Sequence, residues 1–430
     1  MATMGRIRRA IRRMLRERPR ARGAAGSRVR SVLFLRNSYY HFYYLAEALR
    51  RRGWDALTVS TDDPEGPHAN YYHGEDVNLW DADPKRFRKN IEDCYWDALE
   101  RFALLHFAGD GLLTFFPISP EDWEAEEPWD IVEWRRSGRK IAYTISGCNS
   151  GVAQSTVARW SALGGSVVCD KCPWQLTPTV CNDAKNLAWG RKVDRYCDVI
   201  FTEGSPALDY QAIHKAVREP TTMCLDPEFW KPDLAVPDHL KIKRSDNELL
   251  VYHSFGNYDL RTAHGRNIKG TGAIEAAIAR LQAEGRAVRL IFVTDVKNTD
   301  VRYLQAQADV IVDQLNYGRY GATAREAMML GKPTICYINR SEPKPADKLR
   351  STQELPLVSA TEETVYEVLR DLLLDRERRR RLGVAGRAFA MKWHSADACA
   401  ERYEAIYDSV MGGQFGGQAS RPETEEACKS

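Results

Sequence analysis

Apolar and polar positions along the chain form a regular order of short apolar runs and amphipathic stretches. An apolar run at 31–36, a helical stretch at 43–54 and a second apolar run at 55–60 predict a strand, a helix and a strand. Strands joined through a helix need a crossover and lie parallel in one sheet. The pattern continues with helices near 85–101 and 127–138 and strands near 102–107, 140–145 and 197–204.

A second series of the same kind begins after residues 226–246, where Pro, Asp and Lys occur without periodicity and indicate a linker. Its predicted strands are 248–255, 287–293, 308–315 and 333–338, its predicted helices are 271–285, 299–307 and 322–331, and more helices follow from about 361 to 411. The pattern therefore predicts an α/β protein with two Rossmann-like domains, a cleft between them and carboxyl-terminal helices.

The length of 430 residues suits two domains of ordinary size. We expect a division into a basic amphipathic tail at 1–30, a first domain at 31–235 with a Cys-containing insertion at 148–190, a second domain at 246–393, a terminal helix at 394–411 and a disordered tail at 412–430. Ligands of open parallel sheets bind beyond the carboxyl ends of the strands, so we expect the site in the cleft between the domains.

The basic character of the chain belongs to its first 30 residues. They carry eleven Arg and one Glu, about +10, whereas the whole chain has a net charge of +3. Ile7, Ile11, Met14 and Leu15 recur at helical spacing among the arginines, which is typical of a helix on an anionic membrane surface. A disordered extension, or a helix that packs on its own protein, fits the same pattern. Nucleic acid is an unlikely partner because no aromatic side chains are interleaved with the arginines.

No apolar run is long enough to cross a membrane, and the start lacks the apolar core of a signal peptide. We therefore expect a cytoplasmic protein, peripheral at the inner face of the cell membrane if the tail docks there. Its ten Cys are expected to be reduced. Four of them, Cys148, Cys169, Cys172 and Cys181, include a C-x2-C pair and could surround a structural zinc ion. An iron–sulfur cluster and unligated thiols are the alternatives.

Four segments together resemble glycosyltransferases with the GT-B fold, in particular those of family 4. They are "GRNIKGTGAIEAAIARL", "ADVIVDQL", "YGATAREAMMLGKPTICYI" and "RRRRLGVAGRAFAMKWHSADACAERYEAIYDSV". The resemblance covers about 250–411, and a weaker match of the first half to the acceptor domain extends it over most of the chain. It implies transfer of a sugar from a nucleotide diphosphate-sugar donor, with retention and without a catalytic metal ion.

The resemblance also assigns roles to residues of the second half. Arg266 and Lys269, which match family residues that contact the diphosphate, lie just before a predicted helix. Glu326 matches the carboxylate that binds the ribose hydroxyls, and the backbone near Gly321 and Ala322 could face the donor. The chemistry agrees, because positive side chains and helix N-termini stabilise a leaving diphosphate. A solvated loop beside a helix start is the alternative.

One position departs from the family pattern. The family has a second Glu eight residues before the first, where it contacts the transferred sugar, and here that residue is Gly318. We expect Asp313, at the end of the strand 308–315, to take over the contact. The alternative is that Asp313 only caps or salt-bridges near the strand end.

The first half offers candidates on the acceptor side of the cleft. His106 ends a predicted strand and matches a family histidine that contacts the donor sugar or the reaction centre, which makes it a candidate catalytic residue. A structural histidine is the alternative. Asn37, Tyr39, Tyr40 and His41, which follow the first strand, could stack on or hydrogen-bond a sugar, or could only pack.

The sequence therefore predicts a transferase for a saccharide or lipid-linked acceptor in surface polysaccharide or glycoconjugate synthesis. A nucleotide-sugar epimerase shares the architecture and is a second hypothesis. A catalytically inactive scaffold, suggested by Gly318 in place of the family Glu, is a third.

Overall fold

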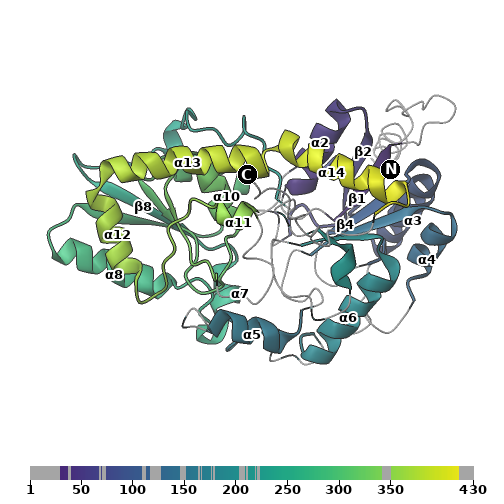
Figure 1. The fold of residues 1–430 in the computed structure, drawn as a ribbon, viewed down its shortest axis with the longest axis horizontal. Helices are drawn as coiled ribbons and strands as arrows, with labels where there is room; N and C mark the ends of the chain where they lie inside the picture. The colour runs from purple at the N-terminus through teal and green to yellow at the C-terminus, as the bar shows by residue number, and fades with distance from the viewer. Residues whose placement is uncertain are drawn as a thin grey trace, which may run out of the picture.

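The chain forms two parallel sheets covered by helices, as seen in a computed structural model (Figure 1). The structure describes residues 30–36, 40–66, 69, 74–108, 113–116, 127–145, 152–162, 165, 167–175, 177, 180–202, 209, 212–217, 219, 223–340 and 350–415. A seven-stranded sheet belongs to the first half of the chain and a four-stranded sheet to the second half. Residues 1–29 of the predicted basic tail, Asn37, Tyr39 and Cys148 lie outside the described residues.

The first sheet has the strand order β3-β2-β1-β4-β5-β6-β7. Its strands are β1 Ser31–Leu35, β2 Asp55–Ser60, β3 Val77–Asn78, β4 Leu104–Ala108, β5 Lys140–Thr144, β6 Val199–Phe201 and β7 Ala216–Val217. Every residue of β1, β2 and β4 is buried, as expected for parallel strands with both faces covered. The described helices of this half are α2 His41–Arg51, α3 Pro84–Arg101, α4 Trp129–Arg136, α5 Gln154–Ala162, α6 Asp183–Tyr196 and the 3-10 turn Ala212–Lys215.

The second sheet has the order β11-β10-β8-β9. Its strands are β8 Leu249–Ser254, β9 Val288–Val293, β10 Val310–Val312 and β11 Thr334–Ile335. The helices of this half are α7 Tyr258–Thr262, α8 Thr271–Ala283, α9 Asn298–Ala306, α10 Ala322–Met329, α11 Arg350–Gln353, α12 Val365–Leu374, α13 Arg376–His394 and α14 Ala396–Met411, with 3-10 turns at Asp238–Leu240 and Ala263–Gly265.

The chain crosses between the halves twice, and the two crossings are joined. Helix α13 belongs to the second half, and α14 continues beyond it over the first half, beside α2 (Figure 1). At the junction, the Leu225 amide of the first crossing donates to the His394 carbonyl at 2.8 Å, and the Ala396 amide donates to the Leu225 carbonyl at 2.8 Å. The two crossing segments are therefore fixed to each other.

Helix α14 supplies part of the core of the first half. Tyr403 stacks on Phe201 of β6 with ring centroids 4.5 Å apart, and both side chains are buried. The Tyr407 hydroxyl lies 2.5 Å from His106 Nδ1 on β4. Without α14, the first sheet would expose Phe201 and His106. The core of the first half therefore depends on a helix from the other end of the chain.

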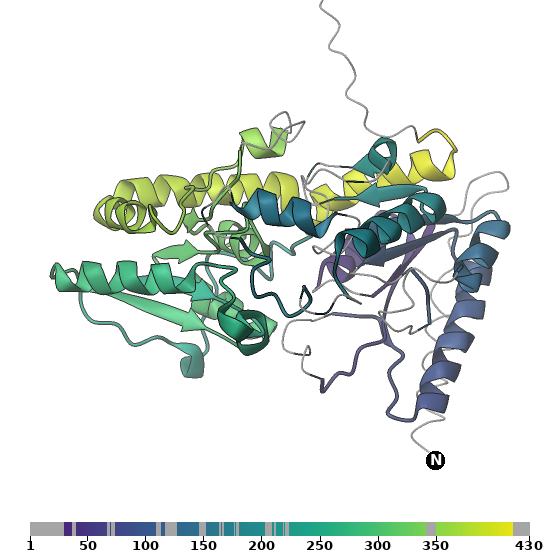
Figure 2. The same ribbon diagram turned by 90° about the horizontal axis from the view of Figure 1, so that it is seen from below.

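Helix α5 of the insertion connects the halves at a second place, and it lies between them in both views (Figures 1 and 2). Trp160 of α5 packs on the loop after β10, where the guanidinium of Arg319 lies 4.5 Å from the centre of its ring. The Asn339 side-chain amide donates to the Trp160 carbonyl at 3.3 Å, and the Asn339 backbone amide donates to the Gly318 carbonyl at 2.9 Å. The loop that contains Gly318 is therefore enclosed by both halves.

The expected fold class is confirmed: the protein is α/β, with two parallel sheets and carboxyl-terminal helices. The insertion at 148–190, for which we predicted no helix, contains α5 and the first part of α6. Helix α6 has the signals of a helix, since Asn182 caps it through the Lys185 amide and Trp189, Val193 and Tyr196 form its buried stripe. Among the described residues, no helix is long and apolar enough to span a membrane.

Three buried histidines are held neutral, and they make stability depend on pH. His106, His253 and His394 are completely buried. Burial lowers the pKa of His253 to about 4, whereas an unfolded chain binds the proton near pH 6.5. As the pH falls from 6.5 towards 4, the unfolded state takes up protons that the native state does not, so the free energy of unfolding decreases.

For His253 alone, we predict that the free energy of unfolding decreases by about 2 kcal/mol between pH 7 and pH 5. Urea unfolding of the wild type and of His253→Asn at both pH values measures it. The variant should show a smaller decrease than the wild type, whatever its stability at pH 7. Equal decreases in the two proteins would show that His253 is not held neutral.

Gly318 occupies a place that no other residue fits. Its φ is +77°, and an added Cβ would lie 2.9 Å from the Asn339 Cβ. Gly138 has nearly the same φ, +79°, but an added Cβ meets nothing within 4 Å. We predict that Gly138→Ala lowers the free energy of unfolding by about 1 kcal/mol, because alanine disfavours the left-handed backbone. Gly318→Ala should lower it by about 1–3 kcal/mol more, because the added methyl group overpacks the site. Urea unfolding measures both variants, and equal costs would contradict the described packing.

Candidate active site

The candidate site lies at the carboxyl edge of the second sheet, where β8 and β10 end and α10 begins. Parallel strands bring their carboxyl ends to one edge, and the helices that follow begin there with amides that have no acceptor inside the helix. Ser254 ends β8 and Asp313 follows β10. The Ser254 hydroxyl lies 3.3 Å from the Thr323 hydroxyl in the first turn of α10. This contact joins the end of the strand to the start of the helix.

Asp313 organises this edge. Its side chain is 1% exposed. Its Oδ1 accepts from Lys269 Nζ at 3.1 Å, and its Oδ2 accepts from the Gly321 amide at 2.7 Å. The carboxylate therefore makes the ion pair that we considered as the alternative to a sugar contact. A direct contact between Asp313 and the sugar stays a prediction.

Lys269 points into the site and is held there from two sides. Its Nζ donates to the Ser254 carbonyl at 3.0 Å as well as to Asp313, and its side chain is 12% exposed. The ammonium has three donors, so two fixed bonds leave one for a ligand. Lys269 lies directly before Gly270, which caps α8. The position agrees with the predicted role at the diphosphate.

The start of α10 presents backbone amides to the same edge. Gly321 caps the helix and Ala322 is its first residue. The Gly321 amide is already bound by Asp313, and an added Cβ at Gly321 would lie 3.2 Å from the Asp313 Oδ2. The helix offers no acceptor to the Ala322 amide. Of the two predicted backbone contacts, the one at Ala322 thus agrees better with this arrangement.

Glu326 lies in the second turn of α10 and is only 3% exposed. Its Oε1 accepts from the Tyr40 hydroxyl at 2.5 Å, and its Oε2 accepts from Gln305 Nε2 of α9 at 2.8 Å. Burial raises the pKa of Glu326, and the hydrogen bonds from Tyr40 and Gln305 oppose that shift. Tyr40 directly precedes α2 of the first half. A carboxylate of the second half is thus held by a hydroxyl of the first half.

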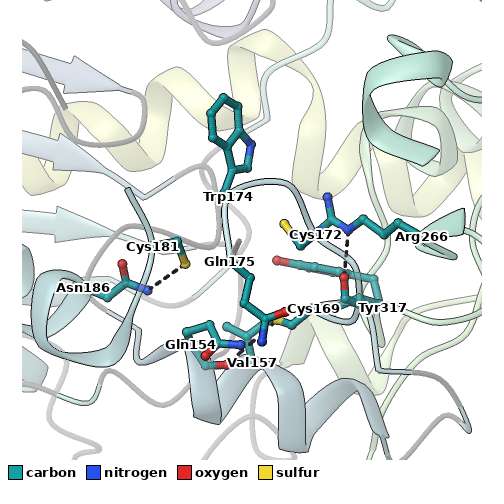
Figure 3. Close-up of a pocket in the computed structure, with 11 residues that line it drawn as sticks. Gln154, Val157, Cys169, Cys172, Trp174, Gln175, Cys181, Asn186, Arg266 and Tyr317 are labelled. Atoms are coloured by element: carbon teal, nitrogen blue, oxygen red, sulfur yellow. Dashed lines mark hydrogen bonds between the residues drawn. The ribbon is translucent and has the colours of Figure 1, made fainter. Parts of the chain in front are cut away.

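Arg266 turns away from this edge, although it is close to Lys269 in the sequence. Its Nε donates to the Val168 carbonyl of the insertion at 2.9 Å. Figure 3 shows it beside Tyr317 in a pocket that the insertion closes. The pocket encloses about 20 Å³, space for about one water molecule, and cannot hold a nucleotide. The predicted contact of Arg266 with the diphosphate stays untested, and it would require the side chain to turn.

The same pocket is lined by three of the four predicted zinc ligands, Cys169, Cys172 and Cys181 (Figure 3). Burial raises the pKa of the Cys169 thiol to about 11. Asn186 Nδ2 donates to the Cys181 sulfur at 3.8 Å. Within the ranges that the structure describes, no three Cys, His, Asp or Glu side chains form a metal-binding group, and Cys148 lies outside those ranges. The structural zinc ion stays a prediction.

His106 lies in the core of the first half. Its Nδ1 is hydrogen-bonded to the Tyr407 hydroxyl at 2.5 Å and its Nε2 to the Thr144 hydroxyl at 2.8 Å, and the side chain is completely buried. Burial lowers the pKa of His106 well below its ordinary value. This is the structural role that we considered as the alternative to catalysis. The function proposed below does not use His106.

Sequence reasoning missed Gln305 and did not connect Tyr40 with Glu326. Gln305 lies on α9, far from any motif, and only its burial at 0% marks it. Tyr40 was expected near a sugar, but its partner lies 286 residues further along the chain. A contact between such distant residues depends on how the two halves pack, which periodicity does not show.

Comparisons with known proteins agree with the fold. No protein-family model and no curated protein sequence matches the chain. Sucrose-phosphate synthase from Thermosynechococcus elongatus has a similar structure, with a TM-score of 0.56 at 14% identity over 89% of this chain and 100% of that chain. Anabaena Alr3699/HepE, solved in complex with UDP and glucose, has a TM-score of 0.50 at 10% identity over 89% of this chain and 100% of that chain.

A glycosyltransferase from Rickettsia africae ESF-5 gives a TM-score of 0.50 at 11% identity over 90% of this chain and 99% of that chain. Identities this low show the fold and not the reaction. The predicted resemblance to family 4 in particular stays a prediction. The chain has the two-sheet α/β fold of the GT-B glycosyltransferases.

Proposed function

We propose that this chain is a glycosyltransferase that moves a sugar from a nucleotide diphosphate-sugar donor to a saccharide or lipid-linked acceptor. One observation carries the proposal. At the edge where ligands of such sheets bind, the structure has a fixed ammonium, a helix start and a buried carboxylate, and the carboxylate contacts the first half. This combination suits a ligand that has phosphates at one end and a ribose diol at the other.

Lys269 and the start of α10 would bind the diphosphate. In the reaction, the bond between the sugar and the diphosphate breaks, and the oxygen of an acceptor hydroxyl bonds to the same sugar carbon. The departing diphosphate oxygen gains negative charge and takes up the proton that the acceptor hydroxyl loses. An ammonium already held by Asp313 and Ser254 can stabilise that charge with little rearrangement. We propose that the transfer needs no catalytic metal ion, because Lys269 and the helix start would supply the positive charge.

Glu326 would bind the ribose. Two adjacent hydroxyls can donate to one carboxylate, and Tyr40 now donates to Oε1 and Gln305 to Oε2. The ribose would take the place of the Tyr40 hydroxyl on Oε1. Donor binding would then exchange a contact between the halves for a contact with the ligand.

The transferred sugar would lie near the loop at Gly318, where this chain lacks the carboxylate of the family. Packing against Asn339 explains the glycine, because a larger residue does not fit at that place. We propose that transfer proceeds with retention and without a side-chain nucleophile, as in the family that the chain resembles. The setting would be surface polysaccharide or glycoconjugate synthesis, at the membrane if the basic tail docks there.

The proposal predicts that Glu326→Gln weakens the binding of a nucleoside diphosphate about 10–100-fold, since a hydrogen bond to a charged group contributes about 1.5–3 kcal/mol. Calorimetric titration of the wild type with UDP, ADP and GDP identifies the base, and the variant is then titrated with the same nucleotide. Glu404→Gln is a suitable control, because Glu404 is a carboxylate on α14 that accepts from Arg52 Nε at 2.6 Å, away from the edge.

Unchanged binding by Glu326→Gln would contradict the ribose role. Incubation of the wild type with sugar nucleotides and a cell extract then separates the three hypotheses by mass spectrometry. Release of free nucleotide supports a transferase, an epimerised sugar supports an epimerase, and binding without either product supports a scaffold.

A further inference from the structure

The carboxyl edge of the first sheet carries a second arrangement, which the proposed donor site does not use. In the order β3-β2-β1-β4-β5-β6-β7, β1 lies between β2 and β4, so the direction of the strand order reverses there. Ligands of open α/β sheets bind at such a reversal. Arg36 is the first residue after β1. It therefore stands at the default ligand position of the half that we assign to the acceptor.

The backbone holds Arg36 at this point. Its φ is +65°, in the left-handed region that residues other than glycine rarely adopt. Its amide donates to the Val59 carbonyl of β2 at 3.0 Å, which fixes the residue to the neighbouring strand. Strained backbone of this kind is concentrated at functional sites.

Arg36 is half-buried, and among the described residues its guanidinium forms no ion pair. Its Nε and Nη2 are closed off from solvent and have no hydrogen-bond partner within the described ranges. Asp62 and Asp130 favour its charge, but neither forms an ion pair with it, and burial lowers its pKa to about 10. Asp62 is exposed. Asp130 Oδ2 accepts from the Thr114 hydroxyl at 2.9 Å and the Phe115 amide at 2.7 Å, and its Oδ1 has no partner.

Arg101, another arginine beside the same sheet, has the carboxylate partner that Arg36 lacks among the described residues. Arg101 ends α3 and binds both oxygens of Asp55, with Nε to Oδ2 at 2.7 Å and Nη2 to Oδ1 at 2.5 Å. Both side chains are nearly inaccessible, at 6% and 5% exposed. Asp55 begins β2, so this pair lies at the amino edge, where no ligand is expected. The arginine without a carboxylate is the one at the ligand edge.

We propose that Arg36 binds a phosphate group on the acceptor, so that the acceptor is a phosphorylated saccharide or a lipid-linked phosphate. A buried cation is costly unless an anion pairs with it, and the planar guanidinium donates two parallel hydrogen bonds to phosphate oxygens. That this phosphate belongs to an acceptor rests on the proposed function. The phosphate site itself stands on the geometry of Arg36.

The test compares Arg36→Met with Arg101→Met in the full chain. Thermal unfolding is followed with glucose 6-phosphate, with glucose, and with a short polyprenyl phosphate in detergent against detergent alone. We expect at least one phosphate compound to raise the Tm of the wild type and glucose not to do so. Arg36→Met should weaken the binding of that phosphate compound at least tenfold.

Arg101→Met should lower the Tm without ligand, because it leaves Asp55 unpaired, and should keep the response to phosphate. Lys269→Met should also keep it, which excludes binding at the donor edge. A response to glucose 6-phosphate identifies a soluble acceptor, and a response to the polyprenyl phosphate alone identifies a lipid-linked one.

Two outcomes would overturn the inference: no response of the wild type to either phosphate compound, or an Arg36→Met variant that responds to the phosphate compound as strongly as the wild type does. Titration with nucleoside diphosphates distinguishes this failure from failure of the proposed function. Arg36 lies at the other sheet, so its replacement should not change nucleotide affinity.

Discussion

The arrangement of this protein depends on a helix that belongs to one half by sequence and to the other half by packing. Helix α14 follows directly on α13 of the second half, yet Tyr403 and Tyr407 are buried in the core of the first half. Because α13 and α14 meet at the Leu225 crossing, the position of α14 sets the position of one sheet against the other. That position brings Tyr40 to Glu326. The candidate site is therefore a product of packing between the halves as much as of the motif.

The two buried carboxylates at the edge of the second sheet are held in different ways. At the second sheet, Asp313 and Lys269 form a pair that is nearly closed to solvent, with the remaining Asp313 oxygen bound to a backbone amide. Glu326 instead receives only neutral donors, and burial raises its pKa. A carboxylate held by neutral hydroxyl and amide groups can exchange them for the hydroxyls of a ligand without losing a charged partner. The ion pair, in contrast, is suited to hold Lys269 in place.

The sequence predicted the second half well, because its strands are continuous apolar runs and helices such as α8 carry a clear amphipathic stripe. The strand ends and helix starts then placed Lys269, Asp313 and Glu326 at one edge before any contact was known. The direction of each side chain could not be predicted. Arg266 and Lys269 share one loop, and only the packing of the insertion turns Arg266 towards Val168.

The same limit applies to the first half. We expected His106 to end a strand, as a catalytic residue would, but it is the third of the five residues of β4 and α14 covers it. The motif gives no reason for Gly318, whereas the structure supplies one in Asn339 and Trp160, which belong to different halves. Local pattern thus predicted the elements and their order. Contacts between residues far apart in sequence decide which candidates can reach a ligand.

The central claim is that the donor binds at the edge formed by β8, β10 and α10. Hydrogen–deuterium exchange of the full chain, with and without the nucleoside diphosphate that it binds, tests this most directly. The account predicts slower exchange of amides in residues 254–271 and 313–326, and in α2 a change caused by release of the Tyr40 hydroxyl from Glu326. Protection confined to other parts of the chain, with these segments unchanged, would contradict it.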